Sequence, residues 1–365
     1  MESHCYIALG SNLGDRFTNL LQGMMRIEER LGPILQISRP YETAAWGFEG
    51  PAFINACLRL ETTQPPQIVL KELQAIEKEL GRKRSAPSVY HSRTLDLDLL
   101  FYGTQQIQTD FLELPHPRIQ LRRFVLDPLV DVAAEWVHPT LGETMLSLQR
   151  NCQDRVTVQQ LAYQKWLPDL FEKNKYLVVA GNIGSGKTSL LKKIASDYGC
   201  MPIYEQFDEN PHLPQFYNDP SAFALDTENF FLHSRITQLN FSADQAHVSD
   251  FWLKKSLIFA QINLAGKEWK AFERSFPAKT KDVSQPDFLV YLDRPVPELQ
   301  ANIQKRGRPY EKSISDDYLK TISESYKEKL RHEHPFPVHV IDVSGMDFIA
   351  HPMRYIVLLR QLAGL

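Results

Sequence analysis

The spacing of hydrophobic residues in the first 100 positions alternates between the patterns of strands and of helices. Short apolar runs bounded by turn residues predict strands, and apolar residues three and four positions apart predict helices, which end at Gly32 and Gly81. The predicted elements are, in chain order, a strand at 6–9, a helix at 13–31, strands at 34–38 and 53–60, a helix at 67–80 and a strand at 94–101. This β-α-β-β-α-β order predicts an α+β domain with the ferredoxin-like arrangement.

The hydrophobic pattern of the second half differs, because buried apolar strands alternate with helices there. The predicted order is a strand at 176–180, a helix from Lys187, a proline-containing loop at 201–220, a helix at 223–245, a strand at 288–292, a helix at 297–304 and a strand at 338–343. Strands separated by helices favour a parallel sheet. The second half is therefore predicted to be an α/β domain.

Length and polarity divide the chain into two domains. Its 365 residues exceed the usual size of a single hydrophobic core. Residues 149–160 are rich in Gln, Asn and charge, and they separate the two hydrophobic patterns. We therefore predict a first domain at 1–155, a linker at 156–172 and a second domain at 173–365.

Charge and cysteine content restrict the expected partners and compartment. The 41 basic and 44 acidic residues give a formal net charge of -3, which provides no general attraction to nucleic acid or to membrane surfaces. The four cysteines lack C-x-x-C spacing, the first residues lack a signal-peptide pattern, and no apolar run approaches the roughly 20 residues that span a bilayer. We therefore expect a cytoplasmic protein whose partners are small molecules, with no nucleic acid and no membrane.

Two aspartates in the predicted strand 94–101 form the first candidate site. Side chains alternate along a strand, so Asp96 and Asp98 project to the same side with their backbones about 7 Å apart. Mg²⁺ typically binds one or two carboxylates and completes its octahedron with water and phosphate oxygens. The pair predicts a magnesium-nucleotide site. The alternative, for the D-x-D pattern alone, is an exposed strand face with two acids.

Six segments of the first half resemble the 6-hydroxymethyl-7,8-dihydropterin pyrophosphokinase family across about 5–148. They are ALGSNLGD at 8–15, YET at 41–43, FINA at 53–56, the pattern Q-x-x-E-x-x-L-G-R at 74–82, RTLDLD at 93–98 and LPHPR at 114–118. The resemblance implies transfer of pyrophosphate from ATP to the pterin, whose hydroxyl attacks the β-phosphorus in line. Such a transfer requires alignment and charge neutralisation rather than a covalent nucleophile.

The same resemblance assigns roles to individual residues. The implied ligands of two Mg²⁺ ions are Asp96 and Asp98, and the implied contacts of the transferred pyrophosphoryl group are Arg82 and Arg93. The implied ATP contacts are Gln74, Glu77, Arg84, His116 and Arg122. The implied pterin contacts are Thr43 and Asn55 at the ring edge and Phe53 and Phe124 on the ring faces. Core packing is the alternative for the two phenylalanines.

One departure from that family's pattern precedes the RTLDLD segment. Tyr90 replaces the usual tryptophan, and His91 and Ser92 stand where a Gly-Pro pair is common. The aspartates, arginines and pterin-edge residues all remain. We therefore expect the departure to alter loop closure and kinetic detail rather than to abolish activity.

The second candidate site is a complete G-x-x-x-x-G-K-T sequence directly after the predicted strand 176–180. The backbone amides of such a loop can encircle a phosphate, and here the loop contains Gly181, Gly184 and Gly186. Lys187 can reach the β and γ oxygens of ATP, and the Thr188 hydroxyl can bind Mg²⁺. The segment therefore predicts a P-loop nucleotide-binding domain.

Motifs after this loop resemble those of the deoxynucleoside kinases, closest to the bacterial deoxyadenosine/deoxyguanosine type, over about 175–343. They are YE at 204–205, DENPHLPQFYNDP at 208–220, FLHSR at 231–235 and IQKRGRPYE at 303–311. The implied roles are general base for the 5'-hydroxyl at Glu205, 3'-hydroxyl contacts at Tyr217 and Glu311, a base contact at Arg235, and closure over ATP by Arg306 and Arg308. The resemblance also implies a P-loop kinase fold and a homodimer.

The segment after Asp250 departs from that family's pattern. Phe251 and Trp252 stand where the family has Arg-Ser, so the arginine beside the 5'-hydroxyl is missing. Loss of one such cation can lower the rate by orders of magnitude. Lys254 and Lys255 follow, and we expect ordinary surface lysines there, because either would reach the site only if the backbone redirected it.

A second departure is Glu228, which stands where the family has its base-reading glutamine. An ionised carboxylate accepts hydrogen bonds and donates none. Guanine presents two adjacent N–H donors, so the departure predicts a preference for deoxyguanosine over deoxyadenosine. The alternative is a Glu228 that is protonated or paired with Arg235, which would cancel the inference.

Three functions fit the two candidate sites. The leading hypothesis is a bifunctional enzyme, a pyrophosphokinase followed by a deoxynucleoside kinase, that uses ATP and Mg²⁺. The second keeps the pyrophosphokinase and makes the second half a catalytically weak nucleotide-binding or dimerisation module, which Phe251 supports. The third is a P-loop ATPase coupled to a partner protein, which leaves Glu205, Tyr217 and Glu311 without a role.

Overall fold

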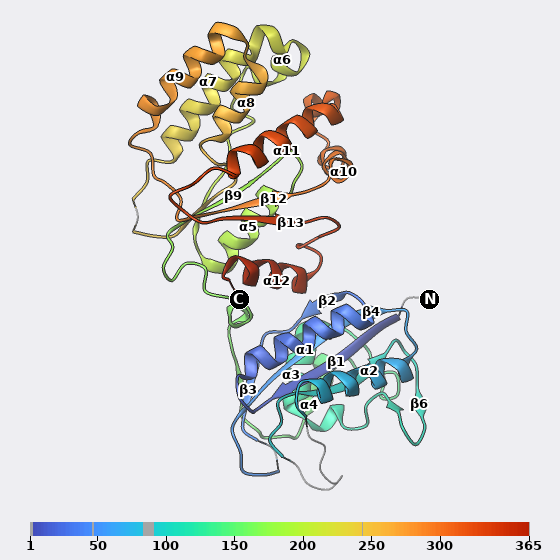
Figure 1. The fold of residues 1–365 in the computed structure, drawn as a ribbon. Coiled ribbons are helices and arrows are strands. Elements are labelled where there is room, and N and C mark those ends of the chain that lie inside the picture. The colour runs from blue at the N-terminus through green and yellow to red at the C-terminus, as the bar shows by residue number, and fades with distance from the viewer. Residues whose placement is uncertain (1–2, 46, 83–90, 243, 365) are drawn as a thin grey trace. The chain divides into compact units, whose positions relative to one another are not determined.

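The computed structural model describes residues 3–45, 47–82, 91–242 and 244–364 (Figure 1). Contacts among the residues divide the chain into two compact units. The first unit is Met1–Pro168 with Ala350–Arg360, and the second is Asp169–Ile349 with Gln361–Leu365. The two-domain organisation predicted from the sequence is confirmed, and the domain boundaries drawn there stay a prediction.

The first unit is built on an antiparallel sheet. Its elements are, in order, β1 (Ser3–Ser11), α1 (Arg16–Leu31), β2 (Ile34–Ile37), β3 (Tyr41–Thr43), β4 (Phe53–Thr62), α2 (Pro66–Glu79), β5 (Asp96–Tyr102), β6 (Ile107–Gln108), β7 (Glu113–Leu114), α3 (Arg123–Ala133) and α4 (Met145–Asn151). Strand β1 lies between β4 and β5 and pairs antiparallel with both, while β2 and β3 pair with β4. This order confirms the ferredoxin-like prediction.

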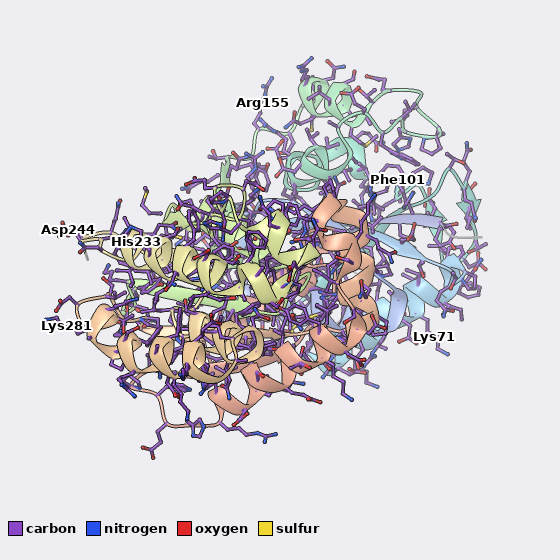
Figure 2. All side chains as sticks on the ribbon, turned by 90° about the horizontal axis from the view of Figure 1, so that it is seen from above. Lys71, Phe101, Arg155, His233, Asp244 and Lys281 are labelled. Atoms are coloured by element: carbon purple, nitrogen blue, oxygen red, sulfur yellow. The ribbon has the colours of Figure 1, made fainter. Side chains whose placement is uncertain are left out.

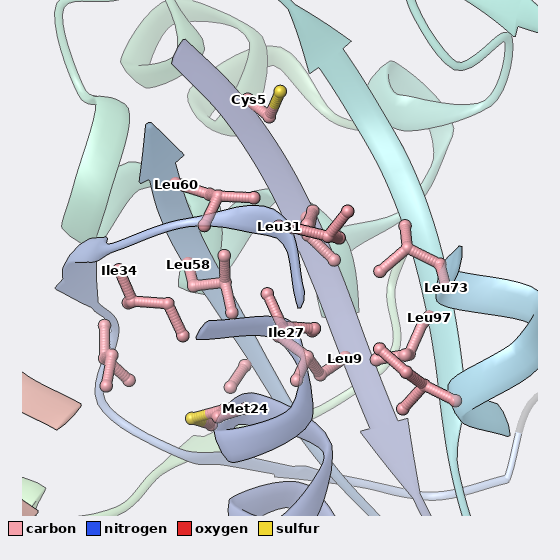
Figure 3. Close-up of a cluster of buried hydrophobic side chains, with 14 of the residues drawn as sticks. Cys5, Leu9, Met24, Ile27, Leu31, Ile34, Leu58, Leu60, Leu73 and Leu97 are labelled. Carbon is pink, nitrogen blue, oxygen red and sulfur yellow. The ribbon is translucent and has the colours of Figure 1, made fainter. Parts of the chain in front are cut away.

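Alternating side chains of β1 separate two hydrophobic clusters on the two faces of the sheet. Ile7 and Leu9 pack with Met24 and Ile27 of α1 and with side chains of α2, as Figure 3 shows for Leu9 and its neighbours. The intervening Tyr6 belongs to the other cluster, which α3 and α4 cover. Full burial of one leucine or isoleucine contributes about 1.5–3 kcal/mol. Hydrophobic packing therefore covers both faces of the sheet. Polar groups can lie at the ends of the strands, outside these two clusters.

Part of the predicted linker 156–172 is ordered on the first unit. Strand β8 (Val158–Gln160) pairs antiparallel with β3. In the short helix η2 (Tyr163–Trp166), the Trp166 side chain is fully buried among the α1 side of the core. Its indole N–H donates a hydrogen bond to the Ser38 carbonyl at 2.9 Å. Because this segment is polar, the sequence did not predict strand β8 or the burial of Trp166.

The second unit contains a five-stranded parallel sheet in the order β10-β11-β9-β12-β13. The strands are β9 (Tyr176–Gly181), β10 (Met201–Ile203), β11 (His247–Ser249), β12 (Phe288–Asp293) and β13 (Val338–Asp342). All six residues of β9 are buried, as expected for the central strand of such a sheet. The predicted parallel α/β domain is confirmed.

Helices connect these strands. They are α5 (Lys187–Tyr198), α6 (Leu213–Asn218), α7 (Pro220–Gln238), α8 (Lys255–Asn263), α9 (Gly266–Thr280), α10 (Val296–Arg306), the short η3 (Pro309–Ser313) and α11 (Asp316–Leu330). Helix α12 (Pro352–Leu362) follows the last strand, and Ala350–Arg360, which includes most of it, belongs to the first unit. The loop predicted at 201–220 contains β10 and α6, and the helix predicted at 223–245 begins at Pro220 and ends at Gln238. Neither strand β10 nor strand β11 was predicted.

Long charged side chains such as those of Lys71 and Lys281 lie on the outer surface. Figure 2 shows Lys71 and Lys281 projecting away from the ribbon, and both residues are exposed. The four cysteines are free thiols. Among the described helices, none combines the length and the apolar character that crossing a bilayer would require.

Candidate active sites

The first site lies where β1, β4 and β5 present their ends next to one another. Gly10 of β1 is in register with Asn55 on one side and with Asp96 on the other. A Cβ atom at Gly10 would lie 3.3 Å from the Asn55 side-chain oxygen and 3.5 Å from the Phe53 ring. The glycine therefore leaves room between a predicted pterin contact and a predicted metal ligand.

Two arginines neutralise Asp96. The Arg82 Nη1 atom lies 2.5 Å from Asp96 Oδ1 and also pairs with Glu77. Arg93 Nη1 donates a hydrogen bond to Asp96 Oδ2 at 2.7 Å. The residues that the sequence assigned to the transferred group and to the metal thus meet at one carboxylate.

Asp98 lies beside this cluster in a strongly acidic environment. Burial, followed by the charges of Asp96 and Glu77, raises the pKa of Asp98 to about 7. Glu77 is 2% exposed, and its Oε1 accepts a hydrogen bond from the Leu97 amide at 2.8 Å. Among the described residues, no group of three or more His, Cys, Asp or Glu side chains could hold a metal. The Asp96 and Asp98 carboxylates still fit Mg²⁺, which typically takes only one or two carboxylates from a protein.

The predicted pterin contacts form a second part of this site. The Asn55 amide donates a hydrogen bond to Thr43 Oγ1 at 2.9 Å, and both side chains are buried. The Arg93 guanidinium lies 5.9 Å from the centre of the Phe53 ring. The Arg122 guanidinium lies 5.5 Å from the centre of the Phe124 ring. Each predicted ring contact therefore adjoins a predicted phosphate contact.

The predicted ATP contacts differ in how well the structure defines them. Burial, followed by the charges of Arg122 and Arg118, lowers the pKa of His116 to about 4, so its imidazole is neutral near pH 7. Gln74 is exposed on α2. Arg84 and Tyr90 lie outside the described residues.

Asn12 is a residue of this site to which the sequence assigned no role. Its side-chain oxygen accepts a hydrogen bond from the Arg93 amide at 2.8 Å. Its amide group donates to the Pro51 carbonyl and to the Ser92 hydroxyl, both at 3.1 Å. Asn12 thereby joins the segment before β5 to the segment before β4. The only sequence signal was its position inside the ALGSNLGD segment.

The second site begins at the glycine-rich loop between β9 and α5. Gly184 and Gly186 have φ angles of 80° and 96°, which favour glycine. A Cβ atom at Gly184 would lie 2.6 Å from the Leu299 carbonyl oxygen. The Lys187 ammonium donates to the Asn182 carbonyl at 2.6 Å, inside the loop. Burial, followed by the charge of Lys255, lowers the pKa of Lys187 to about 7.

Glu205 is the centre of a buried charge cluster. Arg235 binds its Oε1 through two guanidinium nitrogens, and the Lys255 ammonium lies 2.5 Å from its Oε2. Burial alone would raise the pKa of Glu205, but Lys255 and Arg235 hold it at about 2. Glu205 is therefore ionised near pH 7.

Asp250 links this cluster to the glycine-rich loop. Its Oδ1 accepts a hydrogen bond from the Glu205 amide at 2.8 Å, and its Oδ2 accepts one from the Thr188 hydroxyl at 2.5 Å. The Thr188 hydroxyl, the predicted ligand of Mg²⁺, is thus held by a carboxylate. Burial, followed by the charge of Glu205, raises the pKa of Asp250.

The prediction that Lys255 is an ordinary surface lysine is wrong. Its side chain is buried at 4% exposure and belongs to the site. Phe251 is fully buried in the hydrophobic core, and the chain turns after it so that α8 begins at Lys255. Lys254 is partly exposed, with its ammonium 5.5 Å from the Trp252 ring.

A pocket adjoins this cluster and contains most of the predicted kinase residues. Its lining includes Lys187, Thr188, Phe207, Tyr217, Thr227, Glu228, Phe231, Arg235, Lys255, Phe259, Arg306, Glu311 and Tyr318. Arg306 binds Glu311 Oε2 at 2.6 and 2.9 Å, and Arg308 lies 3.4 Å from Glu311 Oε1. The Tyr217 ring stacks on Tyr310 at 5.8 Å. The two lid arginines and the two predicted 3'-hydroxyl contacts are therefore brought together.

Glu228 is 2% exposed and only half of its carboxylate is engaged within the protein. Oε1 accepts a hydrogen bond from the Asn263 amide at 3.0 Å, whereas Oε2 is buried and has no hydrogen-bond partner among the residues that the structure describes. The Asn263 oxygen accepts from the Tyr318 hydroxyl at 3.1 Å, which orients the amide. Arg235 binds Glu205 and Ser256. An unpartnered buried oxygen beside a pocket is suited to a ligand donor.

Comparisons with known proteins match each unit to a different family. Residues 6–134 match the family model of 7,8-dihydro-6-hydroxymethylpterin-pyrophosphokinase, and residues 177–363 match that of deoxynucleoside kinase. A 2-amino-4-hydroxy-6-hydroxymethyldihydropteridine pyrophosphokinase of Porphyromonas gingivalis is 47% identical over 137 residues, which are 37% of this chain and 92% of the relative. A deoxyguanosine kinase of Bacillus subtilis is 30% identical over 184 residues, which are 48% of this chain and 89% of the relative.

A solved structure is also similar to the second half. Deoxyadenosine kinase from M. mycoides with bound dCTP is 21% identical, with a TM-score of 0.47, and the match covers 52% of this chain and 100% of that one. The family assignment rests on the sequence matches. The chain therefore belongs to the 7,8-dihydro-6-hydroxymethylpterin-pyrophosphokinase family through its first unit and to the deoxynucleoside kinase family through its second.

Proposed function

We propose that the protein is a bifunctional enzyme that transfers pyrophosphate from ATP to 6-hydroxymethyl-7,8-dihydropterin and phosphate from ATP to the 5'-hydroxyl of a deoxynucleoside. The observation that carries this proposal is that each unit holds its own cluster of cations and carboxylates, and the cluster of the second unit lines a pocket. Asp96 with its two arginines forms the first cluster, and Glu205 with Arg235 and Lys255 forms the second. Mg²⁺ would be held by Asp96 and Asp98 in one unit and by Thr188 in the other, where it would neutralise phosphate charge.

In the first unit, the residues act by alignment. Asn55 and Thr43 would bind the pterin edge, while Phe53 and Phe124 would lie against its faces. The pterin hydroxyl would then attack the β-phosphorus, and AMP would leave. Arg82 and Arg93, which pair with Asp96, would bind phosphate oxygens of the transferred group.

In the second unit, a loose phosphoryl-transfer transition state requires mainly orientation and charge stabilisation. The ionised Glu205 would orient the 5'-hydroxyl, accept its proton as the bond to phosphorus forms, and hold the cations around it. Lys187 and the lid arginines Arg306 and Arg308 would bind the phosphates of ATP.

The test is an assay of the full-length chain with ATP, first with the hydroxymethyl pterin and then with each of the four deoxynucleosides. The expected result is diphosphorylated pterin with AMP in the first case and a 5'-monophosphate with ADP in the second. If the chain binds ATP at the second site but phosphorylates none of the deoxynucleosides, the alternative of a weak nucleotide-binding module replaces the kinase proposal.

The two arginines of the first site should affect chemistry more than ATP binding. In Arg82→Ala and Arg93→Ala, the single-turnover rate should fall by about 10²-fold or more, because these groups engage charge that develops in the transition state. Lysine should rescue poorly, because a guanidinium binds two oxygens at fixed geometry. Rapid-quench kinetics with parallel ATP titrations measure both effects. Weaker ATP binding with an unchanged single-turnover rate would contradict this assignment.

The base preference of the kinase should follow the charge of Glu228. Burial raises the pKa of Glu228 to about 7, and the charges of Arg235 and Lys255 and the hydrogen bond from Asn263 oppose that rise. The groups around it are Arg235, Lys255, Glu205, Asn263 and Tyr318. The ionised form, present above the pKa, accepts from guanine, and the protonated form can donate to adenine.

The preference for deoxyguanosine over deoxyadenosine should therefore rise by about tenfold between about pH 6 and pH 8. The measured quantity is the ratio of the two kcat/KM values, in which the titration of Lys187 cancels because it acts on both substrates. Glu228→Gln is the control and should remove the pH dependence of the ratio. A parent enzyme that prefers deoxyadenosine at high pH, or an unchanged ratio in the variant, would show that Glu228 does not read the base.

A further inference from the structure

Lys255 is a buried cation at the second site for which the proposed function has no separate role. It is the first residue of α8, and its side chain is almost fully buried. Its ammonium contacts Glu205 Oε2 at 2.5 Å. The same nitrogen lies 5.0 Å from the centre of the Phe259 ring and 5.4 Å from that of Phe207. Aromatic faces stabilise a cation without neutralising its charge.

The position of Lys255 places it next to the phosphate machinery. It lines the same pocket as Lys187, Thr188 and Arg306. Its charge is the largest single electrostatic influence on Lys187 after burial. The backbone amide of Lys255 donates to the Trp252 carbonyl at 2.9 Å, so the turn after Phe251 fixes where the side chain begins.

The charge balance of this cluster favours an incoming anion. Arg235 already binds Oε1 of Glu205 through two nitrogens, so its charge offsets that of the carboxylate. Lys255 adds a second cation to the same carboxylate, and burying a charge is costly unless an opposite charge compensates it. Lys187 adds a third cation and Asp250 a second carboxylate, so these five side chains carry one more positive than negative charge where the glycine-rich loop ends. A phosphate group is the anion that would balance it.

We propose that Lys255 contacts the phosphoryl group as it reaches the 5'-oxygen, in place of the arginine for which Phe251 stands. This proposal rests on the proposed nucleoside kinase function. In the step, the 5'-oxygen bonds to the γ-phosphorus, the bond from that phosphorus to the bridging oxygen breaks, and ADP leaves. The hydroxyl proton passes to Glu205 and then to solvent. The Lys255 ammonium donates to an oxygen of the transferred group and retains its charge throughout.

The test compares ligands with and without a 5'-phosphate in the full-length protein. Calorimetric titration of deoxyguanosine and of deoxyguanosine monophosphate, without ATP, should show that Lys255→Met leaves nucleoside affinity within about twofold and weakens the monophosphate by about tenfold or more. The kcat of the same variant should fall by about 10²-fold. Lys254→Met is the matched control, since Lys254 is the neighbouring lysine outside the site, and it should match the parent in all three measurements.

Two further variants separate charge from structural support. Lys255→Gln can keep a hydrogen bond to Glu205 but has no charge, so it should remain as defective as Lys255→Met. Lys255→Arg keeps the charge and should recover most of the monophosphate affinity and turnover. Thermal unfolding establishes which variants fold, and Lys255→Gln carries the test if the methionine variant does not.

The possible outcomes distinguish the role of Lys255 from the proposed nucleoside kinase function. Equal loss of nucleoside and monophosphate affinity, or full activity in Lys255→Gln, would overturn the role of Lys255 and leave the kinase function intact. A parent that binds neither ligand overturns both proposals. A parent that phosphorylates no deoxynucleoside overturns the kinase function, and the difference in monophosphate affinity between the Lys255 and Lys254 variants still decides whether Lys255 contacts phosphate.

Discussion

Replacing Asp96 or Asp98 by alanine should lower pyrophosphate transfer to the pterin by about 10²–10³-fold or more and leave the kinase reaction unchanged. Asp96 holds both Arg82 and Arg93, so its loss removes a metal ligand and releases two arginines. Burial and the neighbouring acids raise the pKa of Asp98 and so oppose its ionisation. A bound cation would favour the charged carboxylate. Both substitutions should therefore slow phosphate transfer without removing contacts of the hydrophobic core.

The measurement is steady-state pterin turnover at saturating Mg²⁺, with the deoxynucleoside reaction followed in the same preparation. Asp110→Ala is the matched control, because Asp110 is an exposed acid between β6 and β7. The asparagine variants of Asp96 and Asp98 keep the shape of the side chain and should behave like the alanine variants. Near-normal turnover in any of these four variants would refute the assignment of the metal site.

In the second unit, Lys187→Ala should weaken ATP binding, whereas Glu205→Gln should retain binding and lose turnover by about 10²–10⁴-fold. The Lys187 ammonium lies within the glycine-rich loop, where a phosphate would replace its contact with the Asn182 carbonyl. Glu205→Gln removes the charge that holds Arg235 and Lys255, so the 5'-hydroxyl would lose its oriented acceptor. The two variants therefore separate nucleotide binding from transfer.

Equilibrium ATP titration and single-turnover kinetics distinguish these effects, and thermal unfolding verifies that the variants fold. Lys192→Ala is the control for Lys187, because Lys192 is an exposed lysine on the same helix α5. If Glu205→Gln lost ATP binding in proportion to turnover, Glu205 would be supporting the site as a whole rather than the hydroxyl.

The strands and helices of both units were predictable because their signals are local. The run 176–180 and the glycines after it defined β9 and its loop, and the apolar spacing of 13–31 and 67–80 defined two helices to within a few residues. Strand β11 was missed because its three residues are too few to show a hydrophobic pattern in the sequence. In the sheet it lies between β9 and β10, and pairing with both parallel neighbours buries it.

The site was predictable where motif residues are close in sequence, and less so where distant segments meet. RTLDLD placed Asp96 and Arg93 together, and the structure adds Asn12, which reaches Arg93 across 81 positions. Lys255 was misjudged because the position of a lysine after Phe251 depends on which way that phenylalanine packs. The Phe251 side chain packs in the hydrophobic core, and after the following turn the Lys255 side chain contacts Glu205. No spacing rule contains that information.

Trp166 determines where the two halves can be separated for study. A chain cut at residue 155 would lose both β8, which covers the free edge of β3, and the fully buried indole bonded to Ser38. Removal of a buried tryptophan side chain costs about 3–5 kcal/mol, which is a large fraction of the stability of a small domain. An uncovered strand edge also invites pairing with other chains. A fragment of the first unit should therefore extend at least through Leu167, and it would still lack Ala350–Arg360, which belongs to the same unit.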